Sequence, residues 1–191
     1  MWTAVLALVS AIIGAVLVGS YEHWRDWYYR PILQIDYAGP DANKVDGDRW
    51  KDGKQILEVY IRARIRNIGR LPAKNCLVYL TDLRAVQVSG TTPTSFHDPS
   101  PLGWAGWRFT PRDIPRDIPF YVDIMRVSKE TPGWLISVQQ LFDNQEKLKY
   151  YSGTYRFELT ATADNAEPVK FSIDVTYAKD WNGLRAVPSK I

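Results

Sequence analysis

Residues 59–80 read VYIRARIRNIGRLPAKNCLVYL, and this stretch decides the fold. In its first half, apolar and polar side chains alternate with a period of two, which predicts a strand with one buried and one exposed face. Asn67 and Gly69 then supply turn residues, and the almost continuously apolar residues 73–86 predict a second strand that is buried on both faces. We therefore expect a two-strand unit joined by a turn near Gly69 and Pro72.

The same alternation returns near the C-terminus, at residues 155–163 and 171–177. The turn residues 164–166 separate these two stretches, so they predict a hairpin whose apolar side faces a core. About seven short strands, with no helix of crossover length between them, favour an antiparallel immunoglobulin-like β-sandwich over a barrel or an α/β sheet. The shorter strands are expected at residues 33–37, 118–127 and 134–138, and one short helix at residues 137–148.

Two stretches of the sequence do not resemble strands. Residues 39–53 are rich in Asp and Gly, which predicts a polar hairpin loop or connection. Residues 89–119 form a longer loop that contains six prolines, and loops of that length are often functional. Within it, the run PRDIPRDIP at 111–119 suits an extended segment at a sheet edge, where proline removes free hydrogen-bond donors. The candidate partner-binding residues of this loop are Trp104, Trp107, Arg112 and Arg116.

The first twenty residues, MWTAVLALVSAIIGAVLVGS, contain no charged side chain. As a helix they would be about 30 Å long, which matches the hydrocarbon core of a bilayer. No basic residue precedes this stretch, so a transmembrane anchor is favoured over a cleaved signal peptide. Aromatic side chains flank it, as expected at the two membrane interfaces. These interface residues are Trp2 on one side and Tyr21, Trp24, Trp27 and Tyr28 on the other.

The charges that follow the apolar stretch predict its orientation. Arg25 and Arg30 follow it and no basic residue precedes it, so the positive-inside rule places the C-terminal domain in the cytoplasm, tethered to the inner membrane. The chain is expected to comprise a transmembrane unit, residues 1–30, and one immunoglobulin-like domain, residues 31–191.

Small side chains recur in the apolar stretch at helical spacing, which predicts self-association through the transmembrane helix. The alternative is that alanine and glycine are simply common in spanning helices. The small residues are Ala4, Ala7, Ala11, Gly14 and Ala15.

The residue types that carry catalysis or bind metals are scarce in this sequence. The chain has one cysteine, Cys76, and two histidines, of which His97 has no nucleophile motif beside it. The sequence contains neither a phosphate-binding glycine loop nor a pair of cysteines. Asp41, Asp46 and Asp48 lack the distal Glu of an EF-hand and are interpreted as a solvated loop. We therefore expect a protein that is not an enzyme and that holds no cofactor or metal.

Arg62, Arg64 and Arg66 are the clearest candidates for a ligand site. The strand period puts their guanidinium groups, headed by Tyr60, on one face at a spacing of about 7 Å, which suits phosphates or anionic lipid headgroups. These four residues are called the arginine strip below. The alternative is a structural role, in which acidic side chains of neighbouring strands neutralise the arginines. The candidates for that are Glu158 and Asp174.

Residues 66–80, RNIGRLPAKNCLVYL, resemble the strand-turn-strand signature of CARDB-like and related immunoglobulin-like domains. In that signature an Asn-x-Gly turn precedes an Ala and a second polar turn residue. Residues 153–175 are similar to the last hairpin of such modules, and the whole chain resembles bacterial single-pass membrane-anchored proteins that carry one such domain. The resemblance implies a β-sandwich that binds or spaces other molecules, and it implies no activity. The residues that match the signature are Asn67, Gly69, Ala73 and Asn75.

These observations predict a membrane-tethered binding or scaffolding module that recognises an unknown protein partner at the cytoplasmic membrane face. A net charge of +3 is too small for a nucleic-acid-binding protein. One alternative is an extracytoplasmic envelope or adhesion module, for which the same fold would serve. The other is a sensor of an anionic nucleotide or lipid headgroup that binds through the arginine strip.

Overall fold

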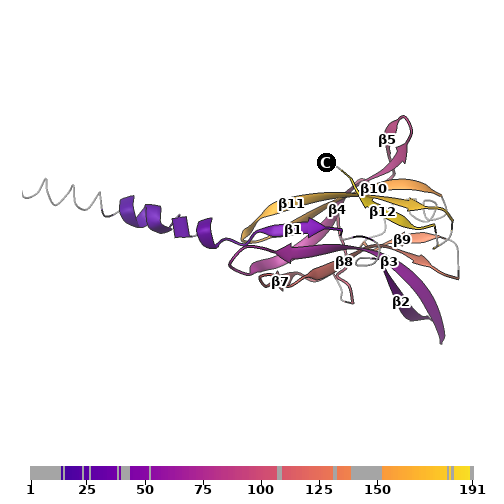
Figure 1. The fold of residues 1–191 in the computed structure, drawn as a ribbon, viewed down its shortest axis with the longest axis horizontal. Coiled ribbons are helices and arrows are strands. Elements are labelled where there is room, and N and C mark those ends of the chain that lie inside the picture. Colours follow the sequence, from indigo (N-terminus) through magenta and orange to yellow (C-terminus); the bar gives the residue numbers. More distant parts are fainter. Residues whose placement is uncertain are drawn as a thin grey trace, which may run out of the picture.

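The computed structural model is built mainly of β-strands, with one helical segment near the N-terminus (Figure 1). It describes residues 14, 16–22, 24, 25, 27–37, 39, 44–51, 53–106, 109–130, 133–138, 152–179, 181 and 183–189. The strands are β1 (Leu33–Asp36), β2 (Lys44–Lys51), β3 (Lys54–Asn67), β4 (Ala73–Gln87), β5 (Gly90–Pro93), β6 (Ser100–Pro101), β7 (Arg112–Ile114), β8 (Phe120–Ser128), β9 (Trp134–Ile136), β10 (Gly153–Ala163), β11 (Ala166–Tyr177) and β12 (Arg185–Pro188).

The strands form two antiparallel sheets, which confirms the predicted mainly β class. The five-stranded sheet has the order β1-β3-β8-β9, and β2 also pairs with β3. The seven-stranded sheet has the order β12-β11-β10-β4-β5, and β6 and β7 also pair with β4. This arrangement is consistent with a β-sandwich.

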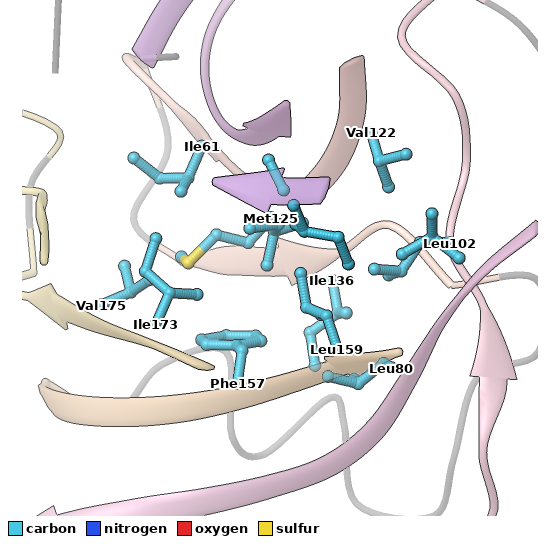
Figure 2. Close-up of a cluster of buried hydrophobic side chains, with 14 of the residues drawn as sticks. Ile61, Leu80, Leu102, Val122, Met125, Ile136, Phe157, Leu159, Ile173 and Val175 are labelled. Atoms are coloured by element: carbon cyan, nitrogen blue, oxygen red, sulfur yellow. The ribbon is translucent and has the colours of Figure 1, made fainter. Parts of the chain in front are cut away.

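One hydrophobic core lies between the two sheets (Figure 2). Figure 2 shows Ile61, Val122 and Met125 of the five-stranded sheet on one side and Phe157 and Leu159 of the seven-stranded sheet on the other. All five side chains are at most 2% exposed. Ile61, Phe157 and Leu159 occupy apolar positions of the predicted period-two patterns, so the alternation correctly identified which face of β3 and of β10 is buried.

The two predicted strands and the turn between them are present, but the strands lie in different sheets and do not pair with each other. β3 pairs with β1, β2 and β8, whereas β4 pairs with β10 and β5. Residues 68–72 carry the chain from one sheet to the other, and the apolar faces of the two strands meet across the core instead of side by side. β4 is also not buried on both faces, because Cys76 and Val78 are fully buried while Leu77 and Tyr79 are half-exposed.

The C-terminal hairpin is confirmed. β10 and β11 pair along their length from Gly153↔Tyr177 to Ala163↔Ala166, and Asp164 and Asn165 form the two-residue loop between them. The shorter predicted strands correspond to β1, β8 and β9. Ser137 and Val138 are not helical, and the other residues of the predicted helix, 139–148, lie outside the described residues.

The predicted polar loop at residues 39–53 contains a strand instead, β2, which pairs with β3 from Lys44↔Ile61 to Lys51↔Lys54. Its sequence, KVDGDRWK, shows no alternation of apolar and polar residues, and the partner strand supplies the pairing. Figure 1 shows β2 extending away from the sheets as part of a two-stranded arm. In the proline-rich loop, β7 pairs with β4 through Ala73↔Ile114, as expected for an extended edge segment.

The N-terminal helical residues lie between residues 14 and 29, and Figure 1 shows this segment leading away from one end of the sheets. No helix in the described part of the chain is both long and apolar enough to cross a membrane. Residues 1–13, which form most of the predicted span and include Trp2, lie outside that part. Most of the predicted small-residue stripe lies outside it too, namely Ala4, Ala7, Ala11 and Ala15.

Candidate functional site

One buried polar side chain, Asn67 at the end of β3, joins the helix to the sheets. Its Oδ1 accepts hydrogen bonds from the backbone N–H groups of Ile32 (3.0 Å) and Gly69 (2.9 Å). Its Nδ2 donates to the carbonyl oxygens of Leu71 (2.7 Å) and Ile114 (3.2 Å). An asparagine amide offers two acceptor and two donor positions, so all four are used. Asn67, which is 0% exposed, thereby ties the segment after the helix, the β3–β4 turn and β7 together.

Gly69 allows the chain after the helix to pass directly against the β3–β4 turn. A Cβ atom at this position would lie 2.4 Å from both the backbone oxygen of Arg30 and the backbone nitrogen of Ile32. The approach is held by a hydrogen bond from the N–H of Leu71 to the carbonyl oxygen of Tyr29 (2.9 Å). Because the neighbouring atoms are backbone atoms that cannot turn away, the structure requires glycine here.

The aromatic side chains of the helix form a surface together with the β3–β4 turn. Trp24 stacks on Tyr28, with ring centroids 5.1 Å apart and an interplanar angle of 12°. Arg70 of the turn lies over the Tyr28 ring at 3.7 Å, and Arg30 lies over the Trp27 ring at 6.0 Å. Such cation–π contacts hold the guanidinium groups in place without removing their charge. The exposed aromatics of the helix are Tyr21, Trp24, Trp27, Tyr28 and Tyr29.

The arginine strip lies on the outer face of β3, and carboxylates of the neighbouring strands pair with its guanidinium groups. The Nε atom of Arg62 lies 2.6 Å from Asp123 Oδ1 of β8. Arg64 donates two hydrogen bonds to Asp36 of β1, at 2.7 and 3.0 Å. Arg66 donates to the same carboxylate at 3.0 Å. The strip is therefore part of an ion-pair network across three strands.

Tyr60 extends this network toward the far end of β3. Its O–H donates to Glu58 Oε2 at 2.6 Å, and Arg126 Nη1 lies 3.7 Å from the same oxygen. Burial and then the Glu58 carboxylate raise the pKa of Tyr60, so its phenol stays protonated and continues to donate. The Arg62 guanidinium lies 5.2 Å above the Tyr60 ring.

The partners of the arginines differ from those named in the sequence analysis. Asp36 and Asp123 pair with the strip, whereas Glu158 and Asp174 lie in the seven-stranded sheet. There Asp174 pairs with Arg156 at 2.7 Å. Acidic side chains of neighbouring strands do pair with the arginines, as the structural alternative predicted. Which side chains do so depends on which strands lie next to β3 in its sheet.

Asp123 is the more deeply buried of the two carboxylates that pair with the guanidinium groups of the strip, with only 8% of the residue exposed. Burial raises the pKa of Asp123, and the Arg62 guanidinium opposes that rise. Arg62 thus favours the ionised carboxylate in an environment that otherwise disfavours it.

The proline-rich loop contributes to the core. Trp104 is 2% exposed, its Nε1 donates to the carbonyl oxygen of Thr110 (3.1 Å), and its ring meets Phe120 edge-on with centroids 6.2 Å apart. The loop reaches the seven-stranded sheet through a hydrogen bond from the N–H of Leu102 to the carbonyl oxygen of Val78 (2.8 Å). Trp104 is therefore a core residue, and the predicted role in partner contact does not fit it.

The other predicted residues of this loop occupy different environments. Arg112 lies over the Phe120 ring at 5.5 Å. Arg116 is exposed and pairs with Asp117 at 3.0 Å. Trp107 lies outside the described residues. The three of these residues that the structure describes, Trp104, Arg112 and Arg116, do not form a common site.

A shallow hollow of about 270 Å³ lies in the seven-stranded sheet between β4 and β10. It lies where β4 carries one extra residue: Asp82 pairs with Glu158 and Leu80 pairs with Leu159, which leaves Thr81 without an opposite residue. The Thr81 hydroxyl donates to the carbonyl oxygen of Glu158 at 3.0 Å. This feature is called the β4–β10 hollow below.

The charges that line the β4–β10 hollow are paired to different extents. Asp82 binds Arg84 at 2.6 Å. The Glu158 carboxylate and the Lys170 ammonium also line the hollow, and neither forms an ion pair with another described residue. The hollow therefore offers one acidic and one basic group for an external partner.

Residues suited to catalysis or metal binding are not gathered in the described part of the chain. No group of three or more His, Cys, Asp or Glu side chains there could hold a metal ion. Cys76 is fully buried, and burial raises the pKa of its thiol to about 12, so it stays protonated and unreactive. His97 is exposed in the proline-rich loop.

Neither the role of Asn67 nor the β4–β10 hollow was predicted from the sequence. Asn67 continues the series Val59, Ile61, Ala63 and Ile65, so a polar residue on the buried face of β3 was the available signal. The hollow depends on the register between β4 and β10, for which the sequence carries no local signal.

No protein-family model matches this chain, and no curated protein or solved structure matches it either.

Proposed function

We propose that the protein is a membrane-tethered, immunoglobulin-like β-sandwich that binds a protein partner at the cytoplasmic face of the inner membrane and catalyses no reaction. The observation that carries this proposal is the junction at Asn67. The buried amide makes four hydrogen bonds, and the one that it accepts from the N–H of Ile32 ties the segment after the helix to the β3–β4 turn and β7, which take the other three. The N–H of Leu71 adds a hydrogen bond to the carbonyl oxygen of Tyr29. Such a junction sets the orientation of a binding surface relative to its tether, which a flexible linker would not do.

The partner-binding surface that we propose is the outer face of β4, β10 and β11 around the β4–β10 hollow. Glu158 and Lys170 line the hollow and form no ion pair with other described residues, so their charges are available to a partner. The arginine strip of the opposite sheet differs, because each of its three guanidinium groups already pairs with Asp36 or Asp123. Charge pairs at an interface mainly determine specificity and association rate, which suits a recognition module.

The test is affinity capture of the full chain from solubilised membranes, compared between matched variants. The double charge reversal Glu158→Lys with Lys170→Glu should abolish capture of the specific partner, because both charges of the surface are inverted. Lys54→Glu is the control, since Lys54 is exposed at the start of β3 and outside the hollow. A partner that binds both variants equally would rule out this surface.

The tether and its orientation need separate measurements. We expect the full chain to stay with vesicles after an alkaline wash, because the uncharged residues 1–20 anchor it. In intact spheroplasts, external protease should leave the sandwich uncut. Digestion from outside would instead favour the extracytoplasmic envelope module.

A further inference from the structure

Exposed apolar side chains gather at the end of the sandwich that the helix joins. After residue 30, seven large hydrophobic side chains are exposed among the described residues, and four of them belong to this end. The other three, Leu57, Val88 and Val187, lie on β3, after β4 and on β12. A group of exposed apolar side chains indicates an interaction surface, whereas scattered ones are ordinary. The group, 45–50% exposed, consists of Ile32, Ile68, Leu71 and Ile118.

The hydrogen bonds of Asn67 hold this group together. Ile32 donates its N–H to Asn67 Oδ1, and the carbonyl oxygen of Leu71 accepts from Asn67 Nδ2. The N–H of Asp117 donates to the backbone oxygen of Asn67 at 2.9 Å, which places Ile118 next to the same residue. Ile68, the fourth member of the group, directly follows Asn67 in the chain. Three separate segments therefore present their apolar side chains at one end of the fold.

Aromatic rings hold two cations at this end. Arg70 lies over Tyr28 and Arg30 lies over Trp27, and neither guanidinium forms an ion pair with another described residue. Their positive charges are therefore available to an external anion. Cations that are interleaved with aromatic and apolar side chains match the surface of a bilayer containing anionic lipids.

The position of Arg70 along the helix agrees with the level of lipid headgroups. Tyr28 lies eight residues after Ser20, which is about 12 Å along a helix. Helical side chains point toward the N-terminus, and the stacking of Tyr28 on Trp24 places the ring about one turn, or roughly 5 Å, nearer the predicted span. The Arg70 guanidinium, which lies over the Tyr28 ring, is then about 7 Å from the hydrocarbon core of the bilayer. The polar headgroup layer is about 5 to 8 Å thick on each side of that core.

We infer that this end of the sandwich rests on the surface of an anionic bilayer, with Arg70 bound to lipid phosphate and Ile68 and Leu71 among the headgroups. The inference rests on the proposed membrane tether. The bilayer is the partner that the chain itself provides, because the helix that carries Tyr28 continues from the predicted span. The anionic cytoplasmic leaflet also suits the proposed orientation.

The test uses the full chain in vesicles of phosphatidylcholine, with and without anionic phosphatidylglycerol. A fluorescent label is attached to Leu71→Cys, and Val88→Cys is the control because Val88 is exposed in the turn at the opposite end of β4. The native thiol of Cys76 does not compete, since it is buried. We expect the label at position 71 to be shielded from aqueous iodide in anionic vesicles, and the label at position 88 to stay accessible in both.

Charge variants separate lipid binding from mere proximity. One basic side chain at an anionic surface changes the ratio of docked to undocked states about fivefold, so Arg70→Gln should raise iodide access at position 71 accordingly. Lys54→Gln is the matched control and should have no effect, because Lys54 is exposed at the opposite end of β3 from Asn67.

The outcomes distinguish this inference from the proposed function. A chain that does not float with vesicles lacks the tether, and both ideas fail. If the chain floats but the labels at positions 71 and 88 are equally accessible, only the inference is wrong. Shielding at position 71 in detergent that disappears on dilution would identify a second copy of the chain as the cover and would also overturn the inference.

Discussion

The arginine strip and Asn67 belong to the same strand but interact in opposite ways. Arg62, Arg64 and Arg66 lie on the outer face of β3, and their side chains are 19, 24 and 34% exposed. Asn67 is fully buried and makes four hydrogen bonds within the protein. A paired charge in contact with water contributes little to stability, whereas a buried polar group is costly once its partners are lost. The uncharged residue is therefore expected to matter more for stability than the three charged ones.

The largest effect is expected for Asn67→Asp. The substitution replaces the Nδ2 donor with a second oxygen, which then faces the carbonyl oxygens of Leu71 and Ile114. We expect the free energy of unfolding of the full chain in detergent to fall by at least about 3 kcal/mol, because a buried charge meets two acceptors. Denaturant titration followed by tryptophan fluorescence measures this loss.

Asn165→Asp is the matched control for that variant. Asn165 makes the same kind of bridge, accepting from the N–H of Lys74 (2.8 Å) and donating to the carbonyl oxygen of Pro72 (3.1 Å), but it is exposed. Water can solvate the new carboxylate, so the free energy of unfolding should fall by less than about 1 kcal/mol. Equal losses for the two variants would show that burial is not what distinguishes Asn67.

Gly69→Ala should produce the next largest effect. The new Cβ would lie 2.4 Å from backbone atoms of Arg30 and Ile32, so the turn and the segment after the helix must separate. We expect a loss of about 1 to 3 kcal/mol, as for other overpacked sites. Hydrogen exchange should accelerate at the N–H of Leu71, which bonds to Tyr29.

The control for this variant is Gly19→Ala, because a Cβ at Gly19 meets nothing within 4 Å. It should leave the exchange rate of the Leu71 amide unchanged. If Gly69→Ala also leaves that rate unchanged, the close approach at the junction does not hold the helix against the turn.

Much of the fold could be predicted because burial alternates along the strands. The apolar positions of β3, β10 and β11 form the core, and the turn at Asp164 and Asn165 lies where its composition suggests. The assignment of strands to sheets could not be predicted in this way. Alternation specifies the buried face of a strand but not its neighbours, so the sequence did not show that β3 and β4 lie in different sheets. The strand β2, whose sequence does not alternate, was missed.

The candidate site was less predictable for the same reason. The common face of the three arginines follows from the strand period, but Asp36 and Asp123 become their partners only through the order β1-β3-β8. Trp104 was misassigned because a tryptophan in a proline-rich loop looks exposed in the sequence, while the loop contacts both sheets in the structure.

Removal of Arg62 should have a moderate effect that depends on pH. Burial raises the pKa of Asp123 and Arg62 lowers it, so Arg62→Ala should raise this pKa further. A carboxyl group whose pKa is higher in the folded than in the unfolded state stabilises the protein below its unfolded pKa, near 3.9, and that stability is lost as the pH rises through the folded value.

The Arg62→Ala variant should therefore be close to the wild type in stability near pH 4 and about 1 to 3 kcal/mol less stable at pH 7. Denaturant titrations across this range measure the difference. Adding Asp123→Asn should remove the extra pH dependence, because the titrating group is gone. If the difference in stability between the wild type and Arg62→Ala does not vary with pH, Asp123 is not the group that Arg62 keeps ionised.

Arg64→Ala should have the smallest effect, although Arg64 makes the best-aligned ion pair of the strip. Its two hydrogen bonds to Asp36 lie at a half-exposed site, and such pairs contribute about 0.2 to 1 kcal/mol. Asp36 also keeps Arg66 as a partner at 3.0 Å when Arg64 is removed, so no carboxylate is left alone. A double-mutant cycle with Asp36→Ala measures the coupling between the two residues. A coupling free energy as large as the fall in the free energy of unfolding expected for Asn67→Asp would contradict this prediction. It would show that the outer face of β3 stabilises the fold as strongly as the buried Asn67.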